Sequence, residues 1–380
     1  MVPWIPCTEM LQVAVICLTD VFLPLDNDTL IHTRSKRFDT MNSLSLMIAC
    51  CALIVLPDAL TAAEPLPVPA DSILKAEGNV AFTEGPTWHP SGNVYFSDIA
   101  NSRIMRRDRN GQIHVYRTPS GKTNGLLFDH KGRLLCCEGG GADSNRRVTR
   151  IELDGTITVL ADNYRGKKLN SPNDLAIDSR GRIYFSDPRY RNRTGIEQLD
   201  DKGEQIEGVY RIDGVGKVER VLTHEVDRPN GILVSQGDKY LYVADNCNDG
   251  PRGMGGNRKL WRFDLKADGN VDPNSRNLMF DWGGDRGPDG MALDTEGRLY
   301  VAAGFNFPSP PRELAKKYKA GVYVISSAGK LLQFIPIPMD MVTNCAFGGD
   351  DLKTLFVTAG HTLWSIRTDA VGYLAWPAAK

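Results

Sequence analysis

The chain has 380 residues, of which 42% are hydrophobic and 24% are charged, with 45 Lys and Arg against 46 Asp and Glu. This composition is ordinary for a folded globular protein and excludes a wholly disordered or collagen-like chain. The charge balance provides no strongly basic face, so nucleic acid is not an expected partner.

The first element in chain order is an apolar run at residues 44–57, LSLMIACCALIVLP. It is shorter than the roughly 20 residues that span a bilayer, so we expect no stable membrane insertion. Basic residues precede it at 34–37 and small residues follow it, a pattern typical of a signal peptide cleaved near Ala63. We therefore expect residues 1–63 to hold a signal peptide, with a possible spurious extension at their start, and the mature protein to be periplasmic or secreted. A buried N-terminal helix is the alternative.

From residue 64 onward the sequence repeats six times, at intervals of 40 to 59 residues. Each copy has a polar opening, a short apolar stretch, a turn and a strand rich in β-branched and aromatic residues, such as GNVYFSD (92–98) and GRIYFSD (181–187). A third strand follows in every copy and a fourth in most. The residues that begin the six copies are Glu84, Asn124, Asn173, Asn230, Asp289 and Asn344.

Units of four strands at this period predict an all-β fold, a six-bladed β-propeller with four antiparallel strands per blade. The sixth copy lacks an obvious fourth strand. SILKAE at residues 72–77 could supply it, which would close the ring with an N-terminal strand. Residues 64–380 are then expected to form one propeller domain.

The cysteines show neither CxxC pairs nor zinc-site spacing. Four of the eight lie before residue 64. The other four, Cys136, Cys137, Cys247 and Cys345, are expected to be small buried hydrophobic residues.

The openings would place six oxygen-bearing side chains at one end of the propeller, because the innermost strand of each blade lines the central channel. An oxygen-only set suits one hard divalent cation, Ca²⁺ before Mg²⁺, Mn²⁺ or Zn²⁺. The alternative is that Asn and Asp open these strands because they tolerate turn geometry.

Five segments in order resemble the SMP-30/gluconolactonase-like family: FTEGPTW (82–88), SPNDLAID (171–178), RPNGILVS (228–235), PDGMALD (288–294) and TNCAFGG (343–349). The segment NRRVTR (145–150) is similar to the bacterial gluconolactonase branch, and the resemblance covers about residues 72–370. It implies a single divalent cation at the channel mouth. The ligands that it implies are Glu84, Asn173, Asn230 and Asp289, with Asp289 also the catalytic base or nucleophile.

The resemblance further implies a carboxylic-ester hydrolase that acts on a small sugar lactone. The cation would polarise the lactone carbonyl while Asp289 activates water; direct attack by Asp289 stays open. Residues 137–141 read CEGGG and lack the His that this branch often carries. Polar residues expected to bind the sugar around the mouth are Asn124, Glu138, Asn145, Arg146, Asp187, Tyr190 and Asn246.

Two other functions remain open. Another lactonase or a phosphotriesterase could use the same site, because specificity lies in the loops. A non-enzymatic propeller that binds a ligand is the third possibility. The sequence does not determine the oligomeric state.

Overall fold

The computed structural model describes residues 66–376 apart from 142, 191–192 and 248–255. The chain divides into two units, residues 1–61 and 62–380, and the described residues belong to the second. The signal peptide predicted within residues 1–63 lies outside the described residues. In the described part, no helix has the length and apolar character needed to cross a membrane.

The first three sheets each contain four antiparallel strands in sequence order. Their strands are β2 (Thr83–His89), β3 (Asn93–Asp98), β4 (Arg103–Arg107) and β5 (Ile113–Arg117); β6 (Leu126–Phe128), β7 (Leu134–Glu138), β8 (Arg147–Ile151) and β9 (Ile157–Ala161); and β12 (Leu175–Ile177), β13 (Ile183–Asp187), β14 (Gly208–Gly214) and β15 (Lys217–Leu222). A two-stranded hairpin, β10 (Asn163–Tyr164) with β11 (Lys167–Lys168), lies between the second and third sheets in sequence.

The other three sheets are also antiparallel, but the fifth gains a further short strand and the outer strand of the sixth comes from the start of the described chain. Their strands are β16 (Pro229–Val234), β17 (Tyr240–Asn246), β18 (Arg258–Leu265) and β19 (Val271–Asp281); β20 (Met291–Asp294), β21 (Leu299–Ala303), β22 (Gly321–Ile325) and β23 (Leu331–Pro336); and β24 (Val342–Gly348), β25 (Thr354–Ala359), β26 (Thr362–Arg367) and β1 (Lys75–Asn79). Strand β1 pairs with β26, with Lys75 opposite Ser365 and Asn79 opposite Thr362. The N-terminal strand thus begins three residues later than the predicted segment.

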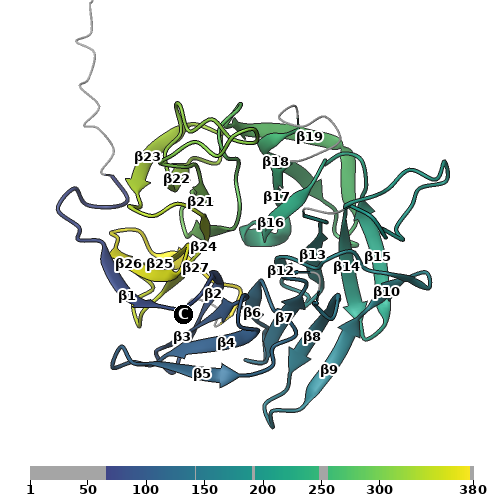
Figure 1. Ribbon diagram of the computed structural model, residues 1–380, viewed down its shortest axis with the longest axis horizontal. Coiled ribbons are helices and arrows are strands. Elements are labelled where there is room, and N and C mark those ends of the chain that lie inside the picture. Colours follow the sequence, from purple (N-terminus) through teal and green to yellow (C-terminus); the bar gives the residue numbers. More distant parts are fainter. Residues whose placement is uncertain (1–65, 142, 191–192, 248–255, 377–380) are drawn as a thin grey trace, which may run out of the picture. The chain divides into compact units, whose positions relative to one another are not determined.

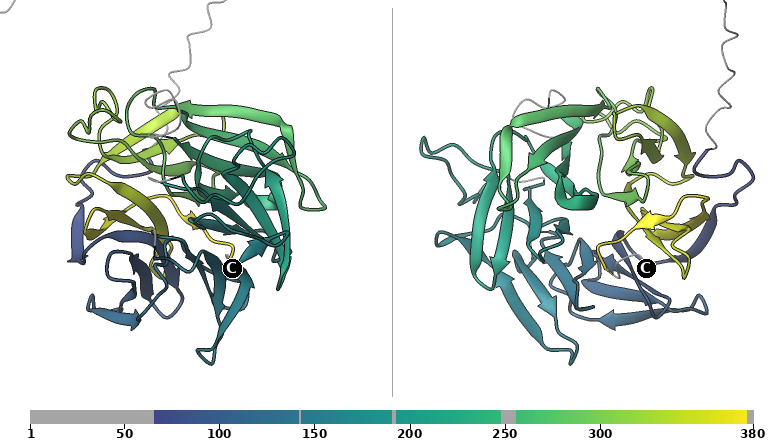
Figure 2. Two further views of the ribbon diagram at one scale, coloured as in Figure 1. Left: turned by 45° about the vertical axis from the view of Figure 1, so that its right-hand side comes forward. Right: turned by 180° about the vertical axis from the view of Figure 1, so that it is seen from behind.

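The first strands of the six sheets contact one another in the order β2, β6, β12, β16, β20 and β24, and β24 contacts β2. Figure 1 shows the sheets radiating around a central axis, and Figure 2 shows the same arrangement turned by 45° and from behind. Within the described ranges, the 3-10 turn η1 (Gln236–Asp238) is the only helical element. The predicted six-bladed all-β propeller is confirmed.

Neighbouring sheets pack through their apolar faces. Successive residues of a strand point to opposite faces, so Cys136 packs with the first sheet's Ile104 and Cys137 packs with the third sheet's Phe185. Burying a side chain of the size of Phe185 contributes about 1.5–3 kcal/mol relative to exposure. Cys136, Cys137, Cys247 and Cys345 are all buried and unpaired, which confirms their predicted role.

The turns after β6, β12 and β20 share one design, an Asp followed four residues later by an Arg. In the last of them, Oδ1 of Asp294 accepts the backbone N–H groups of Glu296 at 3.0 Å and Arg298 at 2.9 Å. Oδ2 of Asp294 binds Nε of Arg298 at 2.6 Å. Gly297 between them has a φ of 79°, a region that glycine adopts without strain.

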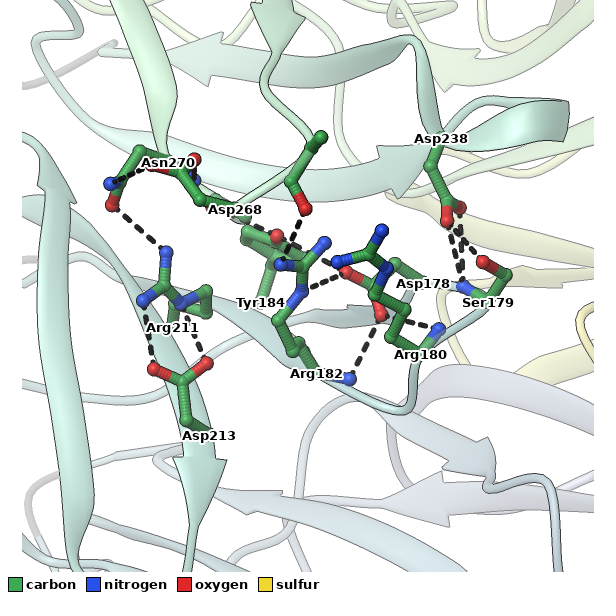
Figure 3. Close-up of polar contacts among 12 residues, drawn as sticks. Asp178, Ser179, Arg180, Arg182, Tyr184, Arg211, Asp213, Asp238, Asp268 and Asn270 are labelled. Atoms are coloured by element: carbon green, nitrogen blue, oxygen red, sulfur yellow. Dashed lines mark hydrogen bonds and ion pairs between the residues drawn. The ribbon is translucent and has the colours of Figure 1, made fainter.

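Polar contacts also join the third and fourth sheets at this end of the strands (Figure 3). Tyr184 donates its hydroxyl to the carbonyl of Gly269 at 2.9 Å, and Arg211 donates to Asn270 at 2.9 Å. Asp238 accepts the backbone N–H of Ser179 at 3.1 Å. Each contact links a residue of the third sheet to a turn of the fourth.

A strand that the repeat pattern did not predict ends the described chain. Strand β27 (Gly372–Tyr373) pairs with the inner edge of β20, with Tyr373 opposite Leu293. Beyond it, the ring of Trp376 lies 5.3 Å from that of His89 and 5.7 Å from that of Phe128. The segment therefore connects the fifth sheet with the first and second.

Candidate functional site

The openings of the inner strands meet in one continuous ring. Gly125 donates its N–H to the carbonyl of Asn173, and Gly290 donates to the carbonyl of Thr343, both at 2.7 Å. The hydroxyl of Thr343 donates to the carbonyl of Thr83 at 3.0 Å. These bonds join the first strands of neighbouring sheets. We name the residues of the six openings the strand-start ring: Glu84, Asn124, Asn173, Asn230, Asp289 and Asn344.

Glycine allows the openings to approach this closely. Gly85 has a φ of 47°, and a Cβ atom there would lie 2.4 Å from the carbonyl oxygen of Asn124. A Cβ atom on Gly231 would lie 2.0 Å from the carbonyl oxygen of Asp289. Glycine after Glu84 and after Asn230 is therefore required by backbone contact between blades.

Three buried carboxyl groups lie at the ring. Glu84, Asp174 and Asp289 are 5%, 7% and 5% exposed. Burial and the charge of Asp289 raise the pKa of Glu84 well above its usual range. Burial also raises the pKa of Asp174 to about 7 and that of Asp289 to about 6. These carboxylates are held away from water by their burial, and their negative charges repel one another.

Asp174 was not among the predicted site residues. Its Oδ2 atom accepts the N–H of Ile232 at 3.4 Å, so it bridges the third and fourth openings. The available signal was the Pro-Asn-Asp opening at 172–174, in which two successive residues carry side-chain oxygens. Assigning a single residue to each blade left the second one out.

Arg286 was also missed, although it lies three residues before Asp289. Its side chain is 3% exposed, and it pairs with Oδ2 of Asp289. Oδ1 of Asp289 is buried and has no hydrogen-bond partner among the described residues. A single Arg in a loop gives no sequence signal of such a contact.

The ring amides differ in their partners. Asn230 donates from Nδ2 to the hydroxyl of Tyr190 at 2.7 Å, which brings the predicted Tyr190 to the ring. Oδ1 of Asn124 is buried and has no hydrogen-bond partner in the described part of the chain. Oδ1 of Asn344 accepts the adjacent backbone N–H of Cys345 at 2.8 Å. Asn173 is buried as well.

Glu138 and Asn145 contact each other within a cluster of charges. Glu138 is fully buried, and its carboxylate accepts hydrogen bonds from Asn145, Arg117, Arg147 and Thr149. Burial alone would raise the pKa of Glu138, but the bonds from Asn145 and Arg147 lower it. Both oxygens of Glu138 are therefore engaged within the protein.

Arg146 and Asp187 hold the chain segment that leads into Asn173. Nε of Arg146 donates to the carbonyls of Leu169 at 2.7 Å and Asn170 at 3.0 Å. Asp187 accepts the N–H of Asn170 at 2.8 Å and that of Ser171 at 2.7 Å. In the structure these two residues support the opening, and their binding of a sugar stays a prediction.

The contact made by Asp187 recurs in two other blades. Asp98 accepts the N–H groups of Ala81 at 3.2 Å and Phe82 at 3.1 Å. Asp245 accepts those of Asp227 at 3.0 Å and Arg228 at 2.9 Å. An Asp at the end of the second strand thus fixes the loop that precedes the first strand of its own blade.

Asn246 lies next to this contact in the fourth blade. Its backbone N–H donates to the carbonyl of Arg228 at 3.0 Å. Its Oδ1 atom is buried with no hydrogen-bond partner in the described ranges. The guanidinium of Arg228 lies 5.1 Å from the ring centre of Tyr190, so this part of the loop packs beside the Asn230–Tyr190 pair.

The ring fits a hard divalent cation by its chemistry. Its side chains offer carboxylate and amide oxygens, the donors that Ca²⁺ prefers. The buried Oδ1 atoms of Asn124 and Asp289 have no hydrogen-bond partner among the described residues, and an unpaired buried oxygen is unfavourable. A cation would satisfy such atoms and offset the repulsion among the carboxylates.

Other polar features lie away from the ring. Asp200, Glu204 and His224 bring ligand atoms together at the surface, but exposed groups of this kind are common without an ion. Hollows of about 420 and 560 Å³ are lined by residues outside the ring, among them Arg107 and Phe356 in the first and Arg180 and Lys239 in the second. None of these features contains a predicted site residue.

The part of the chain that contains the six sheets is also the part that matches known proteins. The model of the SMP-30/gluconolactonase/LRE-like region matches residues 82–361. A gluconolactonase of Zymomonas mobilis is 28% identical over 317 residues, covering 77% of this chain and 80% of its own. A pentonolactonase of Haloferax volcanii is 26% identical over 281 residues, covering 72% and 80%. The structure of a gluconolactonase from Xanthomonas campestris superimposes with a TM-score of 0.64 at 28% identity, covering 80% of this chain and 91% of its own.

Proposed function

The chain belongs to the SMP-30/gluconolactonase/LRE-like family, and we propose that it hydrolyses sugar lactones with the help of one divalent cation. The observation that carries the proposal is Oδ1 of Asp289, which is buried at the ring without a hydrogen-bond partner among the described residues. An oxygen in this state can bind a cation or accept a proton from water. The relatives named as gluconolactonase and pentonolactonase support the substrate class and a carboxylic-ester hydrolase.

The residues that would hold the cation are Glu84, Asn173, Asn230 and Asp289, and their oxygen-only chemistry favours Ca²⁺. When bound, a divalent cation polarises a carbonyl and stabilises the negative charge that develops on its oxygen. The hydroxyl of Tyr190 contacts Asn230 at 2.7 Å, which orients the amide at the ring.

Asp289 is the general base in this proposal. Oδ1 takes a proton from water while the water oxygen forms a bond to the carbonyl carbon of the lactone. The bond between that carbon and the oxygen of the lactone ring then breaks. The oxygen of the lactone ring takes the proton held by Asp289 as it leaves, and the product is an open-chain hydroxy acid.

Hydrolysis of D-glucono-1,5-lactone tests the proposal, measured with calcium and with a chelator. Asp289→Asn should lower kcat by about a hundredfold or more, because the general base is lost. The matched control is Asp294→Asn, which removes a carboxylate from the far end of the same strand. It should lower the melting temperature and leave kcat near the wild-type value.

The outcomes separate the remaining alternatives. Calcium binding without lactone turnover would retain the site and reject the substrate, and a panel of other lactones and phosphotriesters would follow. If the protein neither binds a divalent cation nor hydrolyses the lactone, the enzymatic function is rejected in favour of a ligand-binding propeller. A single turnover in isotopically labelled water tests for nucleophilic attack, in which the Asp289 carboxylate forms a mixed anhydride with the opened lactone. If water then attacks the Asp289 carbon of the anhydride, an unlabelled carboxylate oxygen passes to the product and the label stays on Asp289.

We also propose that the protein is exported. The apolar run at 44–57 and the small residues before Glu64 support this. The intact mass of protein recovered from its native cell envelope or medium tests it. A mature chain beginning near Glu64 is expected, and a full-length chain in the cytoplasm would contradict the proposal.

A further inference from the structure

Arg286 is fixed between the fifth and sixth blades. It precedes β20, and its Nη1 atom donates to the carbonyl of Val342, the first residue of β24, at 2.9 Å. Its guanidinium lies 5.4 Å from the ring centre of Phe305, which follows β21. Because these contacts hold the guanidinium from two sides, it has one orientation toward Asp289.

This orientation makes the two carboxylate oxygens of Asp289 inequivalent. Nη2 of Arg286 pairs with Oδ2, whereas Oδ1 has no hydrogen-bond partner in the described part of the chain. A carboxylate with both oxygens free could bind a cation through both of them. With Oδ2 engaged, the carboxylate presents one oxygen.

Arg286 also changes the charge of the site. Glu84, Asp174 and Asp289 place three acidic groups at the ring, and the field of Arg286 reaches Glu84 as well as Asp289. With all three ionised, one guanidinium leaves a net charge of −2, which a divalent cation would balance. Without the guanidinium the site would bind a cation more tightly, because the Coulomb attraction would be stronger.

We propose that Arg286 is a positioning residue, which engages Oδ2 of Asp289 and offsets one acidic charge so that a single oxygen, Oδ1, faces the ring. The inference rests on the proposed function and deepens it. Arg286 acts through Asp289, limiting how strongly this carboxylate binds the cation and keeping it available as a base.

The test is a comparison of Arg286→Met, Arg286→Lys and Arg286→Gln with the wild type. Calcium affinity is measured by titration calorimetry at one fixed pH, and kcat and KM are measured on D-glucono-1,5-lactone. Arg286→Met should bind calcium more tightly, with a Kd about tenfold lower, since a positive charge is lost beside the site. Its kcat should also fall, by about tenfold or more, because Asp289 is no longer held as a base. Arg286→Lys keeps the charge and should recover most of the wild-type behaviour.

Arg298→Met is the matched control, because it removes an Arg paired with an Asp at the far end of the same strand. It should lower the melting temperature without changing the Kd for calcium. A structural role for Arg286 would instead give weaker calcium binding and lower kcat together. That result, or no change in either quantity, would overturn the proposal.

Arg286→Gln keeps a hydrogen-bond donor for Oδ2 of Asp289. If the Met variant does not fold, the calcium affinity and kcat of the Gln variant test the proposal. Tighter calcium binding with kcat between wild type and Met supports the proposal, whereas weaker binding contradicts it. A wild-type protein that binds calcium but hydrolyses no lactone would reject the proposed substrate, while the calcium affinities would still test Arg286. If the wild type binds no divalent cation, both proposals fail.

Discussion

The side-chain amide of Asn230 donates a hydrogen bond to the hydroxyl of Tyr190 at 2.7 Å. Asn230 begins the inner strand of the fourth blade, and Tyr190 lies in the loop after the second strand of the third. Because its nitrogen is engaged by Tyr190, the amide of Asn230 is held in one orientation at the ring. An oxygen donor at the site is thus oriented by a residue of the neighbouring blade.

Replacing Tyr190 with Phe should loosen this orientation. We expect calcium affinity to fall about fivefold, which corresponds to the loss of one hydrogen bond worth about 1 kcal/mol. Titration calorimetry measures the effect, and Tyr116→Phe, a hydroxyl on the exposed strand β5, is the control. Equal affinity in Tyr190→Phe and wild type would show that the hydroxyl does not orient Asn230.

Replacing Asp174 with Asn removes one of three buried acidic groups. Without a cation the variant should be more stable, by about 1 kcal/mol or a few degrees in melting temperature, because repulsion at the ring is reduced. Calcium should stabilise the variant less than the wild type for the same reason. Thermal unfolding with calcium and with chelator measures both effects, and a larger calcium shift in the variant would contradict the electrostatic account.

Asp187 should make stability depend on pH. Burial raises its pKa to about 7, above the value of about 3.9 in an unfolded chain. The folded state therefore binds more protons between these values, and the contribution of Asp187 to stability falls as pH rises through that window. Urea unfolding of Asp187→Asn should show a stability deficit that is larger near about pH 5 than near about pH 8.

Asp98 is the matched control, because it makes the same backbone contacts in the first blade. Burial alone would raise the pKa of Asp98, but hydrogen bonds from Asn101 and Arg103 lower it. Its contribution is present above the unfolded pKa and lost only at lower pH. The deficit of Asp98→Asn should stay constant over the range in which that of Asp187→Asn changes. If the stability deficits of the two variants change with pH in the same way, the raised pKa of Asp187 is not the cause of the pH dependence.

Trp376 should stabilise the propeller at the end of the strands away from the ring. Trp376→Ala removes the contacts with His89 and Phe128 and should reduce the free energy of unfolding by about 1–3 kcal/mol. Phe307→Ala is the control, because Phe307 is 74% exposed, and it should change stability by less than about 0.5 kcal/mol. A loss below about 0.5 kcal/mol in Trp376→Ala would contradict a stabilising role for these contacts.

The fold was predictable because almost every blade is formed by one continuous stretch of sequence that carries its own strand and turn signals. Alternating strands, Asp-x-x-Gly-Arg turns and six polar openings recur in order, and each reflects short-range geometry. The pairing of β27 with β20 could not be predicted, because a two-residue strand carries no periodicity. Its position depends on the edge of an inner strand that is distant in sequence.

At the site, the sequence by itself determined the residues of the strand-start ring and the oxygen-only chemistry that they offer. The tertiary structure decided which oxygens of the predicted site residues, in the ring and around it, are already engaged within the protein. Glu138 is occupied by residues of the first two blades, Asp187 holds a loop, and Oδ2 of Asp289 is taken by Arg286. Residue type sets what a side chain can bind, whereas its availability depends on the partners that folding brings from other blades.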